Sequence, residues 1–232
     1  MSISFLNSLD RTRLPAQEQN LFISHSKHLY LTQDGLLKYQ KKDLDPKLPG
    51  KRALLQRFVL LDVISGSVYG ELHELAGPKN LAGFLARAWH LKPHNPMRGI
   101  PKVLNVGQLV LGDPTYQADL RLLSELGGFR LGPLPGGFAG GIHAVKAFEK
   151  AVESVFWRTG ENIAPDISMV RALSGALSAE ASGPMAYLWK EKWSMVSPPP
   201  AEFFDRIDSL YQTPGAWRLG DYEIVLQGIP KA

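Results

Sequence analysis

The stretch RFVLLDVISGSVYGELHE, residues 57–74, decides the fold class of this chain. Its apolar run over residues 58–64 is almost continuous, which is typical of a central strand covered on both faces. The dipeptide Ser65-Gly66 predicts a turn, and the apolar residues within 68–72 predict a second strand. Residues 57–74 therefore predict a β-hairpin whose first strand lies inside a sheet.

The chain before this hairpin predicts another one. Residues 21–39 alternate apolar and polar side chains on both sides of Asp34-Gly35, which favours a strand, a tight turn and a short strand. Residues 41–52 (KKDLDPKLPGKR) carry charges and turn formers without an apolar period, so we expect a loop there.

Helices and strands alternate after the hairpin. The expected elements are a helix at 78–91, a strand at 100–107 that stops at Asn105, a helix at 115–126, a strand at 129–135, a glycine-rich segment at 132–141 and a helix at 143–157. Strands that are first paired by hairpins and later alternate with helices imply a mixed sheet with helices packed on it, in the α/β class.

Beyond Thr159 the sequence becomes mostly helical, with segments expected at 167–179, 185–193 and 202–211 and a last strand at 222–227. We therefore predict an N-terminal segment at 1–20, one core domain at 21–159 and a helical C-terminal extension at 160–232.

Composition narrows the class of protein. The 232 residues include no cysteine, which excludes a disulfide framework, thiol catalysis, iron–sulfur clusters and cysteine-containing zinc modules, and fits a reducing cytoplasm. No apolar run is long enough for a signal peptide or a membrane span, so we expect a cytoplasmic protein without a membrane partner. Lys plus Arg outnumber Asp plus Glu by 26 to 22, and this balance permits a polyanionic partner.

Four segments carry a family resemblance: ISHS at 23–26, LLDVISGSVYG at 60–70, PKVLNVG at 101–107 and KAFEK at 146–150. In this order they resemble the landmarks of the catalytic core of retroviral integrases and DDE transposases, which has an RNase H-like fold. The resemblance covers about residues 21–157. It implies three catalytic acids, and these fall on Ser24, Asn105 and Glu149.

The chemistry of that family needs three carboxylates, because two divalent ions must be held close together during phosphoryl transfer. Mg²⁺ and Mn²⁺ are bound by charged oxygens, whereas Ser24 and Asn105 offer only neutral ones. The resemblance therefore implies a remnant triad that binds no metal pair and a chain that has lost strand-transfer catalysis.

Several alternatives remain open at this site. A shift of the first strand would place His25 or Asp34 at the position of the first acid. Asp62, in the predicted hairpin, resembles a residue that is non-catalytic in the family. An active metal-dependent integrase or nuclease would use Asp62 or Asp34 together with Glu149, with Mg²⁺ or Mn²⁺ as its cofactor.

Glu149 can also be interpreted without the family. The predicted helix 143–157 places Glu149 at the edge of its apolar stripe, while Lys146 and Lys150 point outward. An acid beside the stripe, soon after a glycine-rich segment, is where an active-site acid would lie. The alternative is a rim glutamate paired with Lys146 or Lys150, as helix glutamates often are.

Other motifs give weaker signals. Residues 132–141 lack the Lys-Ser/Thr of a phosphate-binding loop, so we expect a loop that borders the site or a plain connector. The histidine pairs His25/His28 and His90/His94 have no third ligand at metal-site spacing. The tryptophans at 189, 193 and 217 are expected to pack in the core or to form a partner surface.

Basic side chains offer a DNA contact, and the candidates are Lys41, Lys42, Lys51, Arg52, Lys146 and Lys150. The sequence therefore predicts a catalytically degenerate integrase-like protein that binds DNA or assists recombination of a mobile element. The third alternative is a protein-interaction scaffold or homodimer without nucleic acid.

Overall fold

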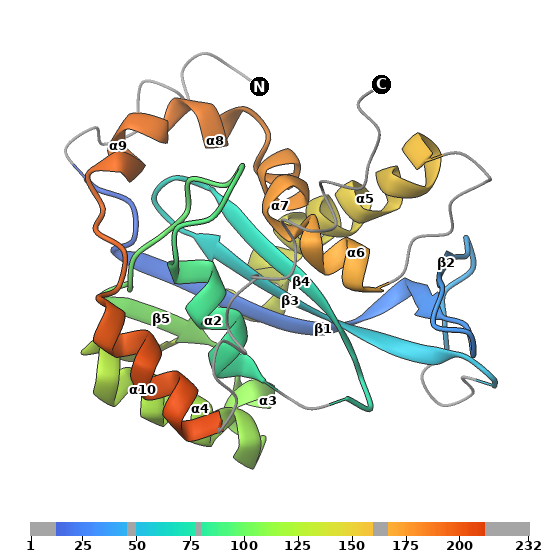
Figure 1. Ribbon diagram of the computed structural model, residues 1–232, viewed down its shortest axis with the longest axis horizontal. Helices are drawn as coiled ribbons and strands as arrows, with labels where there is room; N and C mark the ends of the chain where they lie inside the picture. Colours follow the sequence, from blue (N-terminus) through green and yellow to red (C-terminus); the bar gives the residue numbers. More distant parts are fainter. Residues whose placement is uncertain (1–12, 46–49, 78–79, 160–166, 212–232) are drawn as a thin grey trace.

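The computed structural model describes residues 13–45, 50–77, 80–159 and 167–211, and a mixed sheet of six strands lies at its centre (Figure 1). In chain order the strands are β1 (Glu18–Leu31), β2 (Leu37–Tyr39), β3 (Ala53–Asp62), β4 (Val68–Glu74), β5 (Val103–Val106) and β6 (Arg130–Pro133). The order across the sheet is β4-β3-β1-β5-β6, and β2 pairs with the end of β1. The predicted mixed sheet is confirmed.

Strand direction divides the sheet into two parts. β3 is antiparallel to both β1 and β4, so the first half of the chain forms a meander. β5 is parallel to β1, and β6 is parallel to β5. A parallel pair needs a crossover connection, and the helices between β4 and β6 provide it.

The hairpin predicted from residues 57–74 is the pair β3 and β4. Asp62 begins its turn, where the Gly66 N–H donates to the Asp62 carbonyl over 2.9 Å. Gly66 has a φ of 68°, a left-handed conformation that glycine adopts without strain. β3 lies between β1 and β4 and is buried along most of its length, as its apolar run predicts.

β1 is longer than predicted. It begins at Glu18 rather than at residue 21, and it runs for 14 residues to Leu31. Its pairing with β3 shifts between His25 and Tyr30, so a bulge re-aims the side chains along this strand. The predicted Asp34-Gly35 turn follows, with the Gly35 N–H donating to the Thr32 carbonyl over 3.0 Å.

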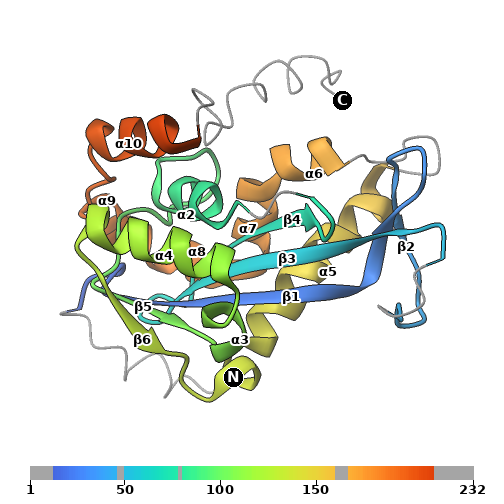
Figure 2. The ribbon, with the colours of Figure 1, turned by 90° about the horizontal axis from the view of Figure 1, so that it is seen from below.

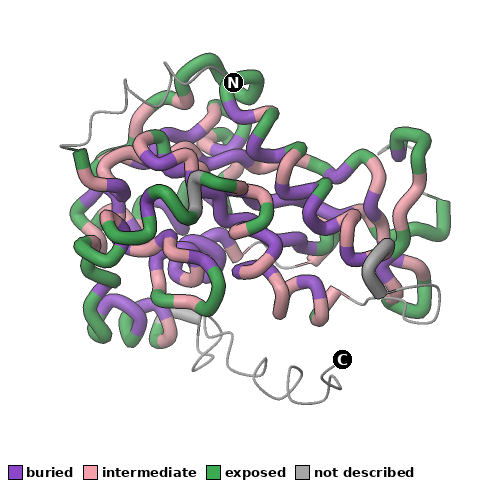
Figure 3. The backbone as a smooth tube through the Cα atoms, turned by 90° about the horizontal axis from the view of Figure 1, so that it is seen from above, coloured by how far each residue is buried: buried purple, intermediate pink, exposed green. Residues whose placement is uncertain are grey.

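Helices cover both faces of the sheet (Figure 2). One face carries α2 (Leu81–Trp89), α3 (Gln108–Leu111), α4 (Pro114–Gly127) and α10 (Ala201–Tyr211), and the other carries the 3-10 helix η1 (Gly137–Gly141), α5 (Ile142–Thr159), α6 (Ile167–Ala172) and α7 (Ser174–Ser182). Because side chains alternate along a strand, Leu21 and Phe58 enter the first core, while Phe22 and Val59 enter the second. The buried segments are concentrated in the middle of the molecule (Figure 3).

The part of the C-terminal extension that follows α7 shares the first core with the predicted core domain. The predicted helix at 185–193 is divided into α8 (Pro184–Leu188) and α9 (Lys190–Ser194). Trp193 is 1% exposed, and the Phe203 ring of α10 lies 6.1 Å from the Trp89 ring of α2. Trp189 and Trp193 are thus core residues, whereas residue 217 and the strand predicted at 222–227 lie outside the described residues.

α7 covers the outer edge of β4 through its serines. The Ser182 hydroxyl accepts from the Val68 N–H over 2.8 Å, and the Ser178 hydroxyl accepts from the Gly70 N–H over 2.9 Å. Arg171 Nε of α6 donates to the Leu72 carbonyl over 3.0 Å. The outward-facing backbone groups of this end strand therefore find side-chain partners in place of another strand. The predicted single helix at 167–179 is instead divided into α6 and α7.

Among the described residues, none of the helices has both the length and the apolar character that crossing a membrane requires.

Candidate functional site

Asn105 lies on β5, and its neighbour across the parallel pairing is Asn20 of β1. The side chain is 3% exposed. Its Nδ2 donates to Glu18 Oε1 over 2.7 Å and to Asn20 Oδ1 over 2.8 Å. A Cβ on Gly132 of β6 would lie 2.3 Å from Asn105 Oδ1, so only glycine leaves room for this amide. Asn105 thus acts as a hydrogen-bond donor toward the oxygens of Glu18 and Asn20.

Ser24 lies farther along β1, opposite Arg57 of β3. Its hydroxyl is buried and has no hydrogen-bond partner among the described residues. Ser24 lies four positions after Asn20, which is roughly 13 Å along a strand. The register therefore brings Asn20, and not Ser24, beside Asn105.

Glu149 lies on α5 and is 8% exposed. Its Oε1 accepts a 2.5 Å hydrogen bond from the Ser26 hydroxyl, and its Oε2 pairs with the Arg57 guanidinium. Arg57 also donates to the His25 carbonyl, so the guanidinium joins β1, β3 and α5. Burial lowers the pKa of Arg57, and the Glu149 charge opposes that shift. Glu149 is therefore neither a free acid nor paired with Lys146 or Lys150.

Phe22 lies on the same strand face, midway between Asn20 and Ser24, and is 1% exposed. A Cβ on Gly141 would lie only 1.9 Å from the Phe22 ring. The Phe138 ring meets it edge to face, with centroids 6.0 Å apart. The glycine-rich segment 132–141 thus ends in η1, which packs onto an aromatic ring between the two polar groups.

The alternative acids have other surroundings. Asp62 is fully buried, and its carboxylate accepts from the N–H groups of Ala16 and Ser65, both over 2.7 Å, and from the Ser65 hydroxyl over 2.8 Å. Burial raises the pKa of Asp62, and these hydrogen bonds oppose that shift. It holds the β3–β4 turn, five residues along β3 from Arg57. Asp34 is exposed in the β1–β2 turn.

A metal pair does not fit these residues. Asn105 directs N–H donors at Glu18 and Asn20, and Arg57 already neutralises Glu149. Within the described ranges, no three His, Cys, Asp or Glu side chains are grouped so that they could hold a metal ion. The Asn105 amide and the Arg57 guanidinium thus supply the positive partners that metal ions would supply to the carboxylates of an integrase site.

The predicted basic residues lie at the surface in two groups. Lys41, Lys42, Lys51 and Arg52 are exposed near the β1–β2 hairpin, and Lys146 and Lys150 are exposed on α5. Tyr39 of β2 packs against the core to which α5 contributes, where burial and the charge of Glu153 raise the pKa of Tyr39. The β1–β2 hairpin and the helix α5 are labelled in Figure 1.

Sequence reasoning missed a buried ionic cluster between β4 and α2. Arg87 Nε and Nη2 donate to the two carboxylate oxygens of Glu71, each over 2.7 Å. The Tyr69 hydroxyl and His73 Nε2 contact the same carboxylate over 2.7 and 3.0 Å. The available signal was Glu71 within the second, otherwise apolar strand of the predicted hairpin, because a buried charge requires a partner.

The surroundings of this cluster determine the protonation states of Glu71 and His73. Burial opposes the charge of Glu71, but Arg87 and His73 outweigh that cost and hold the Glu71 pKa far below its ordinary value of 4.5. Burial lowers the pKa of His73 below 6.5, and Glu71 only partly offsets this. At neutral pH the folded protein therefore holds Glu71 charged and His73 neutral.

We expect acid to destabilise the protein through this cluster. Below pH 6.5 the unfolded chain takes up a proton that folded His73 resists, and below pH 4.5 the same holds for Glu71. The free energy of unfolding should therefore fall as the pH falls, by up to about 1.4 kcal/mol per pH unit for each such proton. Urea titrations between pH 8 and 4 would measure this slope.

The matched variant is His73→Gln, which keeps a donor for Glu71 but cannot titrate. Its slope between about pH 7 and 5 should be shallower than that of the wild type. Equal slopes in the two proteins would contradict the assignment to His73.

No protein-family model matches the chain, and no curated protein matches its sequence significantly.

Proposed function

We propose that this chain is a catalytically inactive relative of the RNase H-like integrase and transposase cores and that it binds DNA. The observation that carries the proposal is the ion pair of Arg57 with Glu149, because it neutralises the remaining acid of the triad from inside the protein. A working site of that family would need this acid for a metal ion.

The arrangement of the strands supports the ancestry. Three acids can surround a metal pair only if the first strand lies beside the strand of the second acid and the helix of the third crosses the same face. Here β1 lies beside β5, and α5 covers the face that carries Phe22 and Asn20. The order of these elements is the one that the family's chemistry requires, although the residue beside Asn105 is Asn20 rather than Ser24, and only Glu149 is an acid.

The surface charge supports DNA as the partner. Lys146 and Lys150 are exposed on either side of Glu149 in the sequence of α5, and exposed Lys41 and Lys42 follow β2, whose Tyr39 packs against the core to which α5 contributes. Lysine contacts to phosphates release counterions, so the resulting affinity falls steeply with salt.

The double variant Lys146→Gln/Lys150→Gln should weaken the binding of a duplex oligonucleotide about 10-fold or more at 0.1 M salt. It should also make the plot of log affinity against log salt shallower by about 2, since each phosphate contact contributes about 0.9 to that slope. Fluorescence anisotropy across a salt series measures both quantities.

Lys102→Gln is the control, because Lys102 is exposed at the start of β5, away from the hairpin. It should bind like the wild type. DNA binding that is absent, or that the double variant leaves unchanged, would refute the DNA interface. Cleavage or joining of DNA ends with Mn²⁺ that Glu149→Gln abolishes would refute the loss of catalysis.

A further inference from the structure

One face of the sheet is uncovered where β1 meets β2. There β1 pairs with β2 on one side and with β3 on the other, so Tyr30 lies directly between Lys38 and Leu54. The adjacent residues Leu29 and Leu31 point to the opposite face, where they enter the second core together with α5. Tyr30, Lys38 and Leu54 therefore share the face that the first core occupies farther along the sheet.

Among the described residues, no helix covers this part of that face. None of the side chains of the first core comes from residues 27–40 or 50–55. Figures 1 and 2 both show α2, α4 and α10 toward the end of the sheet that lies away from β2. We call the uncovered surface the hairpin face, and it is formed by Tyr30, Lys38, Arg52 and Leu54.

The hairpin face is positively charged, and its cations have free donors. Lys38 and Arg52 lie on it, and Lys41, Lys42 and Lys51 are exposed in the segments that adjoin it. Within the described ranges, none of these five side chains forms an ion pair or donates a hydrogen bond. A polyanion would therefore meet charge that the protein itself does not neutralise.

The nearby acids do not cancel this charge. Residues 27–52 contain seven Lys or Arg and only three Asp. Asp43 is paired with Lys27 over 3.0 Å, and Asp34 is exposed in the β1–β2 turn.

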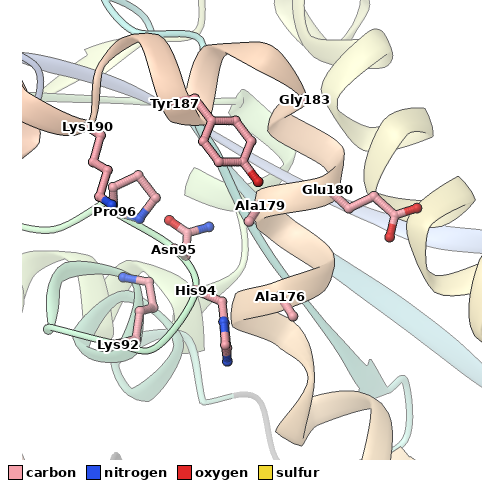
Figure 4. Close-up of a pocket in the computed structure, with 10 residues that line it drawn as sticks. All are labelled: Lys92, His94, Asn95, Pro96, Ala176, Ala179, Glu180, Gly183, Tyr187 and Lys190. Carbon is pink, nitrogen blue, oxygen red and sulfur yellow. The ribbon is translucent and has the colours of Figure 1, made fainter. Parts of the chain in front are cut away.

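The groove between residues 92–96 and α7, shown in Figure 4, differs in this respect. Lys92 lines that groove, but its Nζ already donates to the carbonyls of Ala88, His90 and Met97. The hairpin face is thus the better site for an anionic partner.

A planar stack lies at the centre of the hairpin face. The Arg52 guanidinium lies over the Tyr30 ring, 5.0 Å from its centre. Pairing with β2 and β3 holds the backbone of Tyr30 on both sides, so the ring stands on a rigid strand. Nucleobases stack on aromatic rings and on guanidinium planes. The centre of the face therefore offers a stacking partner, and the lysines around it offer contacts to phosphates.

This combination selects a single strand. The bases of a duplex stack on one another, so a duplex presents phosphates to a flat surface but no open base face. The bases of a single strand are free to stack on protein side chains. An acidic protein would use the positive charge but not the planar stack.

We propose that the hairpin face binds single-stranded DNA. One base stacks on the pair of Tyr30 and Arg52, and the neighbouring phosphates lie at Lys38 and the adjoining lysines. Because α5 covers the opposite face, this contact is separate from Lys146 and Lys150. The inference rests on the proposed function only in taking DNA as the partner.

Fluorescence anisotropy of the full chain with a labelled oligothymidine tests the site. Tyr30→Leu should weaken the single strand about tenfold and leave a duplex of the same length unchanged. Tyr30→Phe is the matched control, because it keeps the ring and should bind like the wild type. Lys38→Gln should make the salt dependence of single-strand binding shallower by about 0.7. Circular dichroism checks that each variant is folded.

The outcomes separate this site from the duplex interface. Lys146→Gln/Lys150→Gln should weaken the duplex and leave the single strand unchanged. No single-strand binding, equal single-strand affinity in the wild type and Tyr30→Leu, or an equal loss in Tyr30→Phe would overturn the hairpin site, whatever the duplex does. A loss confined to Tyr30→Leu would support it even if the double variant left duplex binding unchanged, a result that would reject only the interface at α5.

Discussion

Replacing Arg57 with methionine should lower the free energy of unfolding by about 3–5 kcal/mol, because Glu149 would keep a buried charge without its counter-ion. The two side chains are only 7% and 10% exposed, so water cannot replace the guanidinium. The Ser26 hydroxyl supplies a hydrogen bond but no charge. Urea denaturation followed by circular dichroism measures the loss.

The double variant Arg57→Met/Glu149→Leu distinguishes a lost ion pair from a general disturbance of the core. Removing both charges should bring the stability back to within about 1–2 kcal/mol of the wild type, since buried pairs can be replaced by apolar residues of similar size. Arg121→Met, which breaks the exposed pair of Arg121 with Glu125 on α4, should cost less than about 1 kcal/mol. A similarly small loss in Arg57→Met would contradict a buried ion pair.

The double variant Asn20→Asp/Asn105→Asp should lose about 3 kcal/mol or more at pH 7. Asn105 now donates to Glu18 and Asn20, and the change replaces these donors with charged acceptors that repel Glu18. Part of the stability should return in acid, where the new carboxyl groups are protonated.

The same variant tests the proposal that the wild-type residues bind no metal pair. The two carboxylates introduced at positions 20 and 105 would lie beside that of Glu18 and provide the charged oxygen ligands that Mn²⁺ prefers. Mn²⁺ should therefore raise the melting temperature of the variant. Saturation at about 100 times the dissociation constant would restore nearly 3 kcal/mol. We expect millimolar Mn²⁺ to leave the wild type unchanged. An equal rise in the melting temperature of both proteins would show that the neutral oxygens of Asn20 and Asn105 are enough to bind Mn²⁺. The argument that the wild-type residues do not fit a metal would then fail.

Local signals predicted much of the fold. The β3–β4 hairpin follows from an apolar run and a Ser-Gly turn, and α4 ends where expected because Gly128 adopts a φ of 68°. These features depend on a few consecutive residues, so the sequence alone contains them.

The register between β1 and β5 and the pairing of Arg57 with Glu149 could not be predicted from such local signals. Asn20 lies beside Asn105 only because β1 begins at Glu18 and pairs in parallel with a strand about 85 residues later. Arg57 and Glu149 are 92 positions apart, and nothing local identifies them as partners. The sequence pattern placed Glu149 at the edge of an apolar helix stripe, but its ion pair with Arg57 depends on how α5 crosses the sheet.

Ser178 and Ser182 of α7 affect whether copies of this protein can associate by strand addition. An end strand with open amide groups can recruit a strand from another molecule, which is how fibres grow. The hydroxyls of Ser178 and Ser182 close β4 to that reaction. In the described part of the chain the other end strands are short: β6 has four residues, of which Pro133 has no N–H to offer, and β2 has three. Side-chain hydrogen bonds thus oppose strand addition at β4, and the short length of β6 opposes it at the other end of the sheet.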